Sequence, residues 1–310
     1  MKKYFVILLL IVLAGVSGCK KEEEGVLTIL LPDGIPAIAL GGLFNHSDLA
    51  FKIVSGPDIL TSELVQENYD IIVAPITAGA KLYLSEATSY HFAAVLTTGN
   101  SYIVSQKATP LVNLKDLEGK QVAAYGEANT PDIILKAALA HEEVTSDVVY
   151  ETSVNEVVSN RFIGFNTVDY ILCAEPVLSK LELQMGLEIN IIDLQSILSD
   201  QISLIPQAGI FIHTMRPEVV QFLDDVEENI DFLNQNTTEY VAQLLKLDAT
   251  VYPTFQALGE ETLIHSIPRS QIYYERSITC QTELNQYFAM INQYNAHILG
   301  GVLPDENFIQ

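Results

Sequence analysis

The chain has 310 residues, of which 16 are basic and 39 acidic, giving a formal net charge of −23. Such an acidic surface repels phosphate backbones and therefore argues against nucleic acid as a partner. The sequence contains no Walker loop, G-x-S-x-G, G-x-G-x-x-G, C-x-x-C or H-E-x-x-H motif, and its six histidines are scattered. We therefore expect no metal site, no cofactor and no catalytic nucleophile.

The first 18 residues have the pattern of a secretory signal. Lys2 and Lys3 precede an apolar run over residues 4–14, and small residues follow up to Cys19. The apolar run is shorter than the roughly 20 residues that span a bilayer. Removal of residues 1–18 leaves 14 basic residues against the 39 acidic ones, a balance of −25.

Val16-Ser17-Gly18-Cys19 resembles a bacterial lipobox, and residues 19–25 then form a polar tether. The resemblance implies lipidation of Cys19, with two or three acyl chains giving stable anchoring. We expect a protein held on the extracytoplasmic face of the cell membrane. The alternative is an ordinary signal peptide with a chance cysteine, which the position of Cys19 and its polar tether disfavour.

Strand and helix patterns alternate through the first part of the mature chain. Strands are predicted at residues 26–31, 51–54, 69–74 and 91–96, and helices at 36–44, 58–67 and 75–86. A second block begins near Tyr102 and repeats the alternation, with strands at 121–125, 148–150, 169–173 and 190–194. After a strand at 207–213, the remaining segments, including 217–234, 237–247, 262–266 and 277–294, are predicted to be helical.

This alternation predicts an α/β protein with mainly parallel sheets covered on both faces. We expect two α/β lobes joined by two hinge crossovers. Lobe 1 would comprise residues 26–100 and 210–310, and lobe 2 with the hinge segments would comprise residues 101–209. Cys173 lies in an apolar strand pattern, so a buried free thiol is favoured over a disulfide with Cys280.

Six stretches stand out along the chain: YDIIVAP at 69–75, LKDLEGK at 114–120, YGEANTP at 125–131, AEP at 174–176, PQAGIF at 206–211 and GGVLPDENF at 300–308. In this order, they resemble the solute-binding proteins of ABC importers. The nearest group is the SsuA/THI5-like (NMT1-like) family for nitrate, sulfonate, taurine and thiamine precursors. The resemblance implies a type II periplasmic-binding-protein-like fold that performs no covalent chemistry. It also implies a monomer that carries a small-molecule solute to an ABC permease.

Ligands of open α/β sheets lie beyond the carboxyl ends of the strands, so loop residues after strands are the candidate site. These residues are Gly34, Ile35, Pro75, Thr77, Thr98, Asn100, Asn129, Thr130 and Glu175. Each also has a structural interpretation as a turn glycine, helix cap or helix-start residue. Arg269 is a candidate for bracing the cleft or the lobe packing.

A carboxylate such as Glu175 in the cleft would suit a nitrogenous solute with N–H donors or positive charge. A sulfonate-type anion, held by backbone N–H groups and hydroxyls, is the close alternative. Two other functions stay open at this point. One is an enzyme of pyrimidine or thiamine-precursor metabolism on the same fold, although the cysteine-rich motif of the eukaryotic pyrimidine synthases is missing. The other is a ligand-sensing lipoprotein.

Overall fold

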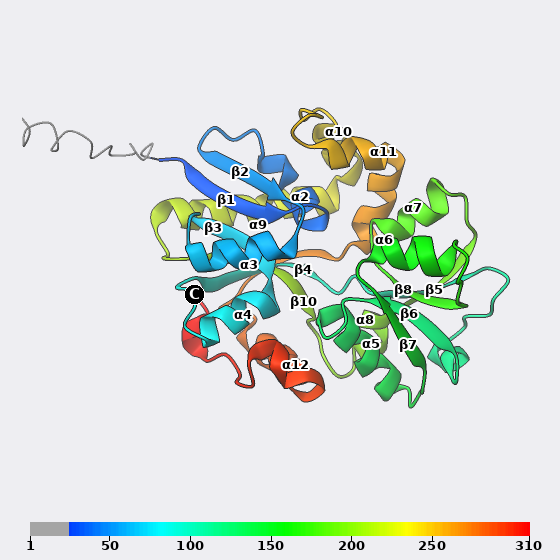
Figure 1. Ribbon diagram of the computed structural model, residues 1–310. Helices are drawn as coiled ribbons and strands as arrows, with labels where there is room; N and C mark the ends of the chain where they lie inside the picture. The colour runs from blue at the N-terminus through cyan, green and yellow to red at the C-terminus, as the bar shows by residue number, and fades with distance from the viewer. Residues whose placement is uncertain (1–24) are drawn as a thin grey trace, which may run out of the picture.

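The computed structural model describes residues 25–310, so the predicted signal peptide and Cys19 lie outside the described residues. Within this range the strands form two sheets (Figure 1). The six-stranded sheet has the order β11-β4-β10-β3-β1-β2, formed by β1 (Leu27–Pro32), β2 (Leu49–Val54), β3 (Ile71–Pro75), β4 (His91–Thr98), β10 (Pro206–Ile212) and β11 (Ile272–Arg276). The five-stranded sheet has the order β7-β6-β8-β5-β9, formed by β5 (Tyr102–Gln106), β6 (Gln121–Tyr125), β7 (Asp147–Glu151), β8 (Tyr170–Cys173) and β9 (Ile189–Asp193).

Helices cover both sheets, and each sheet with its helices is called a lobe below. Lobe 1 holds the six-stranded sheet and lobe 2 the five-stranded sheet. The helices of lobe 1 are α2 (Ile35–Leu40), η1 (Gly41–Leu43), α3 (Pro57–Gln66), α4 (Ile76–Leu84), α9 (Pro217–Gln235), α10 (Thr237–Leu244), α11 (Pro253–Ser266), η4 (Ile267–Arg269), α12 (Gln281–Asn295), η5 (Ala296–Leu299) and η6 (Glu306–Phe308). Those of lobe 2 are η2 (Leu114–Leu117), α5 (Thr130–His141), α6 (Val154–Glu156), the π-helical segment η3 (Val157–Phe162), α7 (Val177–Leu183) and α8 (Leu194–Leu198).

Alternate residues of each strand enter different apolar cores, because successive side chains of a strand point to opposite faces. In β1, Leu30 packs in one core while Ile29 and Leu31 pack in another. The core that holds Leu30 also includes residues of α12, such as Leu284, and it continues into lobe 2, where it includes Val122 of β6. The two lobes therefore share apolar packing.

The expectation of mainly parallel sheets was wrong, because both sheets are mixed. β1 pairs in parallel with β2 and β3, but β10 runs antiparallel to both β3 and β4. In lobe 2, β6 is parallel to β7 and β8, whereas β5 is antiparallel to β8 and β9. The chain leaves lobe 1 at the end of β4 and returns from lobe 2 into β10, so β10 must run opposite to β4.

The strand β11 was also missed, and α11 begins at Pro253, well before the predicted helical segment at 262–266. β11 pairs only with β4, at the edge of the sheet, and its residues are mostly half-buried. Apolar and polar residues alternate only weakly in Ile272–Arg276, so the sequence alone does not mark it as a strand. It forms a strand by pairing with β4. Among residues 25–310 there is no helix with the length and apolar character needed to cross a membrane.

Candidate functional site

The carboxyl ends of several strands in the two lobes face one another. β4 leads out of lobe 1 into the crossover, and β10 lies antiparallel to both β4 and β3, so β1, β2 and β3 also end toward lobe 2. β5 leads away from lobe 1, and β8 runs antiparallel to it, so β6, β7 and β8 end toward lobe 1. The loops predicted to hold the site therefore lie along these two opposed edges, and Figure 1 shows the two lobes side by side.

A groove of about 620 Å³ is lined by residues from both edges. Lobe 1 contributes the end of β3, residues of α3 and α4, the last residue of α12 and residues of η5, and lobe 2 contributes the loop before α5. The lining residues are Leu60, Thr61, Leu64, Ala74, Pro75, Thr77, Ala78, Lys81, Leu82, Ala128, Asn129, Asn295, His297 and Ile298. Three of the predicted site residues, Pro75, Thr77 and Asn129, are thus brought together although they come from different sheets.

The polar and charged side chains of the groove are few and differ in exposure. Thr77 is buried in the first turn of α4, whereas Lys81, one turn further along, is exposed. Asn129 is the N-cap residue of α5, but its side chain does not accept a helical N–H and instead donates to the carbonyl of Glu127 at 3.2 Å. Among the described residues that line the groove, only Lys81 and His297 have ionisable side chains. The positive charge of Lys81 and the N-terminus of α4, where Pro75 and Thr77 lie, favour negative charge in the groove.

Thr130 does not line this groove. It is the first residue of α5, is buried, and its hydroxyl lies 3.2 Å from the hydroxyl of Tyr287 on α12. Tyr287 is itself fully buried. Thr130 therefore helps to join lobe 2 to α12.

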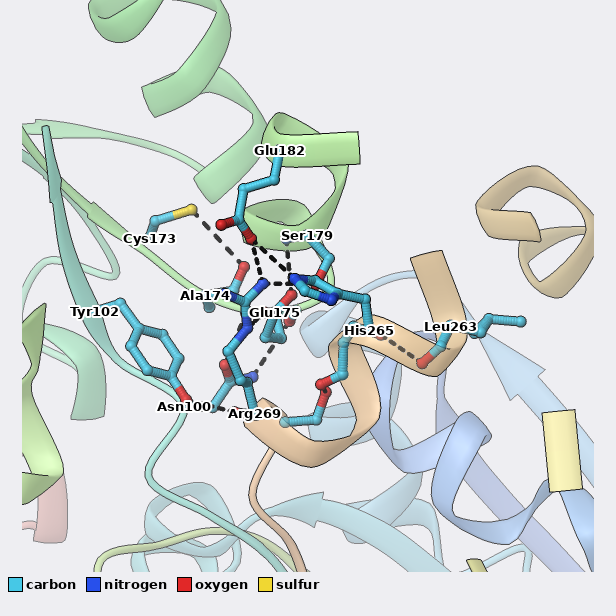
Figure 2. Close-up of polar contacts among 12 residues, drawn as sticks. Asn100, Tyr102, Cys173, Ala174, Glu175, Ser179, Glu182, Leu263, His265 and Arg269 are labelled. Atoms are coloured by element: carbon cyan, nitrogen blue, oxygen red, sulfur yellow. Dashed lines mark hydrogen bonds and ion pairs between the residues drawn. The ribbon is translucent and has the colours of Figure 1, made fainter. Parts of the chain in front are cut away.

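Asn100 and Glu175 come together away from the groove. The side chain of Asn100 exchanges two hydrogen bonds with the backbone of Glu175, and the Glu175 carboxylate lies 2.6 Å from Nε of Arg269 (Figure 2). The second carboxylate oxygen accepts the backbone N–H of Ser179 at 3.0 Å. Burial raises the pKa of the Glu175 carboxyl, although the Ser179 amide and Arg269 act against that shift. Arg269, which the sequence analysis named as a candidate for bracing the cleft or the lobe packing, therefore contacts a residue of lobe 2.

The other three predicted residues occupy separate positions at the edge of lobe 1. Gly34 precedes α2 with a positive φ of 94°, and Ile35 is part of the apolar core. The backbone N–H of Thr98 donates to the carbonyl of Gln271 at 3.0 Å, beside β11. None of these residues lines the groove described above.

Lys81, Asn295 and His297 are among the groove residues that the sequence did not predict. Lys81 lies inside a predicted helix rather than in a loop, so a search limited to loops after strands passes over it. Asn295 is the last residue of α12 and His297 lies in η5, so both are more than 200 positions from the loop after β3 in the sequence. No local motif marks them, because contacts of α12 with α5 and of η5 with α4 bring them to the groove.

Two α/β lobes with their strand ends facing across a groove define the architecture of a periplasmic binding protein, and comparison with known proteins agrees. The chain matches the NMT1/THI5-like family model over residues 41–239, more than half of its length, and therefore belongs to that family. No curated protein sequence gives a significant match.

Solved structures share this fold across almost the whole chain. An ABC transporter protein from Parabacteroides distasonis is 22% identical with a TM-score of 0.75, covering 93% of this chain and 99% of that one. The periplasmic aliphatic sulphonate binding protein SsuA of Escherichia coli is 13% identical with a TM-score of 0.66, covering 92% of both chains. The alkanesulfonate-binding SsuA of Xanthomonas axonopodis pv. citri, bound to MOPS, is 12% identical with a TM-score of 0.59, covering 92% and 96%. The expected fold class is confirmed.

Proposed function

We propose that this chain is the extracytoplasmic solute-binding lipoprotein of an ABC importer. It binds a small solute in the groove between the lobes and delivers it to the permease. The observation that carries the proposal is the groove of about 620 Å³, which is walled by Pro75 and Thr77 of one lobe and Asn129 of the other. A solute that contacts both walls stabilises the closed arrangement by shifting a pre-existing equilibrium. Membership of the NMT1/THI5-like family supports this role.

The charges of the groove support a sulfonate-type or other anionic solute. The argument for a nitrogenous or cationic solute depended on Glu175, but that carboxylate is paired with Arg269 and is not among the groove residues. Lys81 and His297 are present instead, and both can donate hydrogen bonds to an oxyanion. Glu175 as a direct ligand contact stays a prediction, with both of its oxygens already engaged by Arg269 and Ser179.

Isothermal titration calorimetry tests the proposal with taurine and ethanesulfonate as anionic or zwitterionic probes and thiamine as a cationic one. We expect a sulfonate to bind and Asn129→Ala to weaken that binding. Asn45→Ala is the matched control, because Asn45 is exposed in the loop before β2 and does not line the groove. Binding of thiamine alone would refute the anionic preference. Binding of a sulfonate that is unaffected by Asn129→Ala would place the site elsewhere.

A further inference from the structure

The side chain of Arg269, a residue of lobe 1, contacts lobe 2. Arg269 ends the short helix η4, which directly follows α11, and its guanidinium lies against α7 of lobe 2 (Figure 2). Its Nε is 2.6 Å from a carboxylate oxygen of Glu175, which lies just before α7. Its Nη2 is 2.6 Å from Glu182 and 2.9 Å from the hydroxyl of Ser179, both on α7. One side chain of lobe 1 therefore contacts three residues of lobe 2.

The backbone around this cluster is tied to the crossover between the lobes. The hydroxyl of Tyr102, at the start of β5, donates to the carbonyl of Arg269 at 2.5 Å. Asn100, within the crossover itself, is bonded to the backbone of Glu175. The segment from Asn100 to Tyr102 is the first connection between the lobes, so Arg269 and Glu175 lie directly beside the point at which the lobes would turn.

The remaining ion pairs differ from this cluster. Among residues 25–310, pairs such as Arg161 with Glu151 and Arg276 with Asp224 lie within one lobe. The pairs that join the lobes end on the two carboxylates at α7: Arg269 with Glu175, Arg269 with Glu182, and His265 with Glu182 at 3.3 Å. Charge pairing between the lobes is thus concentrated at the seam between α7 and the α11–η4 segment.

Because the cluster is largely buried, separating its charged groups would cost free energy. The Glu175 side chain is 0% exposed and that of Arg269 is 26% exposed. A buried carboxylate that loses its partner stays desolvated and uncompensated, so breaking such a pair costs more than forming it contributes. The rigid fork of a guanidinium also restricts the relative positions in which its carboxylate partners are satisfied. A rotation of α7 away from η4 would separate these charges.

We propose that Arg269 sets the resting angle between the two lobes by clamping α7 to the α11–η4 segment next to the crossover. Arg269 is a positioning residue, since it does not line the groove. The proposal depends on the two-lobe fold and not on which solute is bound, so it can be tested on the protein without solute. If the cluster only stabilises the fold, its loss lowers the stability and leaves the angle between the lobes unchanged.

The test is a distance measurement between spin labels on the two lobes by double electron–electron resonance. Lys115→Cys in lobe 2 and Asp231→Cys in lobe 1 supply exposed attachment sites in the full chain. Cys19→Ser removes the lipidation cysteine, and the native Cys173 and Cys280 are buried, with thiol pKa values that burial raises to about 12. We expect Arg269→Gln to broaden the distance distribution and shift it from that of the parent. Arg269→Lys, which retains the charge without the fork, should give a smaller change.

Arg276→Gln is the matched control, because it removes an arginine–carboxylate pair lying wholly within lobe 1. Its distance distribution should equal that of the parent. An unchanged distribution in folded Arg269→Gln would overturn the proposal, and so would an equal broadening in Arg276→Gln. If Arg269→Gln does not fold, Glu182→Gln replaces it, since the Glu182 side chain is 26% exposed and its loss leaves the buried pair intact. A shift in that variant supports the clamp, and no shift rejects it.

Discussion

Asn100 and Glu175, 75 positions apart, exchange two hydrogen bonds at the point where the chain passes between the lobes. The side-chain amide of Asn100 donates to the Glu175 carbonyl at 3.2 Å, and its Oδ1 accepts the Glu175 N–H at 2.7 Å. Asn100 also has a φ of 61°, in the left-handed region. Asparagine tolerates this conformation better than most residues. Asn100 therefore both adopts the left-handed backbone conformation of the crossover and supplies the two hydrogen bonds to Glu175.

Substitutions at Asn100 should separate these two requirements. Asn100→Gly keeps the backbone conformation accessible but leaves the buried N–H and carbonyl of Glu175 without their partner, at a cost of about 1–3 kcal/mol for each unsatisfied group. Asn100→Ala should be less stable still by about 1–2 kcal/mol, because of the left-handed φ. Urea unfolding of both variants measures the cost of the lost hydrogen bonds and the cost of the left-handed backbone conformation. If the glycine and alanine variants were equally stable, the left-handed φ at position 100 would carry no energetic cost for alanine.

The hydroxyls of Thr130 and Tyr287 should be energetically coupled. Tyr287→Phe leaves the buried Thr130 hydroxyl without its partner, whereas Thr130→Val together with Tyr287→Phe removes both ends of the contact. A coupling free energy of about 0.5–1.5 kcal/mol is expected from a double-mutant cycle measured by chemical unfolding. Additive effects of the two substitutions would show that the hydroxyls do not depend on each other.

Asp70 should make stability fall in acid. Burial alone would raise the pKa of its carboxyl, but two hydrogen bonds from Thr28 at 2.8 Å and the ion pair with Arg216 at 2.5 Å outweigh burial and lower it. Because the folded pKa lies below the unfolded one, this contribution is present above about pH 4 and is lost as the pH falls through the folded value.

Asp70→Asn should therefore be less stable at pH 7, by about 1.5–3 kcal/mol for a charged hydrogen bond. The difference from the wild type should shrink as the pH is lowered below about 4. Unfolding free energies measured from pH 7 to pH 2.5 check this, with Asp231→Asn on the exposed surface of α9 as the control. A difference that stays constant with pH would mean that the ionised form of Asp70 is not the stabilising species.

Lys81 should contribute to the affinity for an anionic solute. Lys81→Gln removes the positive charge in the last turn of α4, and we expect binding of a sulfonate to weaken about tenfold, equivalent to ~1.4 kcal/mol. Lys246→Gln, an exposed lysine outside the groove, should leave the affinity unchanged. Calorimetry at two salt concentrations checks the charge effect, because screening should reduce the difference. Equal affinities of the two variants would remove Lys81 from the site.

Cys19 should determine attachment to the membrane. Cys19→Ser should prevent acylation at the lipobox-like sequence, so we expect the protein to move from the detergent phase to the aqueous phase in a Triton X-114 partition of whole cells. Ser17→Ala, which keeps a small residue two positions before the cysteine, should remain in the detergent phase. Detergent partitioning of Cys19→Ser like that of the unaltered chain would contradict lipidation at this position.

The order of strands and helices and the places where loops meet the strand ends follow from local patterns. Apolar runs, helix-start prolines and turn residues act over a few positions, so they identified the loop after β3 and the start of α5, and through them Pro75, Thr77 and Asn129. The alternation of strands and helices also predicted the two lobes, and the family resemblance, spread over segments from residue 69 to residue 308, added the type II periplasmic-binding-protein-like fold.

Contacts between distant segments decided the rest. The antiparallel direction of β10 follows from the path of the chain through both lobes, which no local pattern records. The partners of Glu175 and Thr130, Arg269 and Tyr287, lie 94 and 157 positions further along the chain. A carboxylate beside a helix start has the same sequence signature whether it meets a solute or an arginine. Only the packing of α11 and η4 against α7 determines which of the two lies within hydrogen-bonding distance.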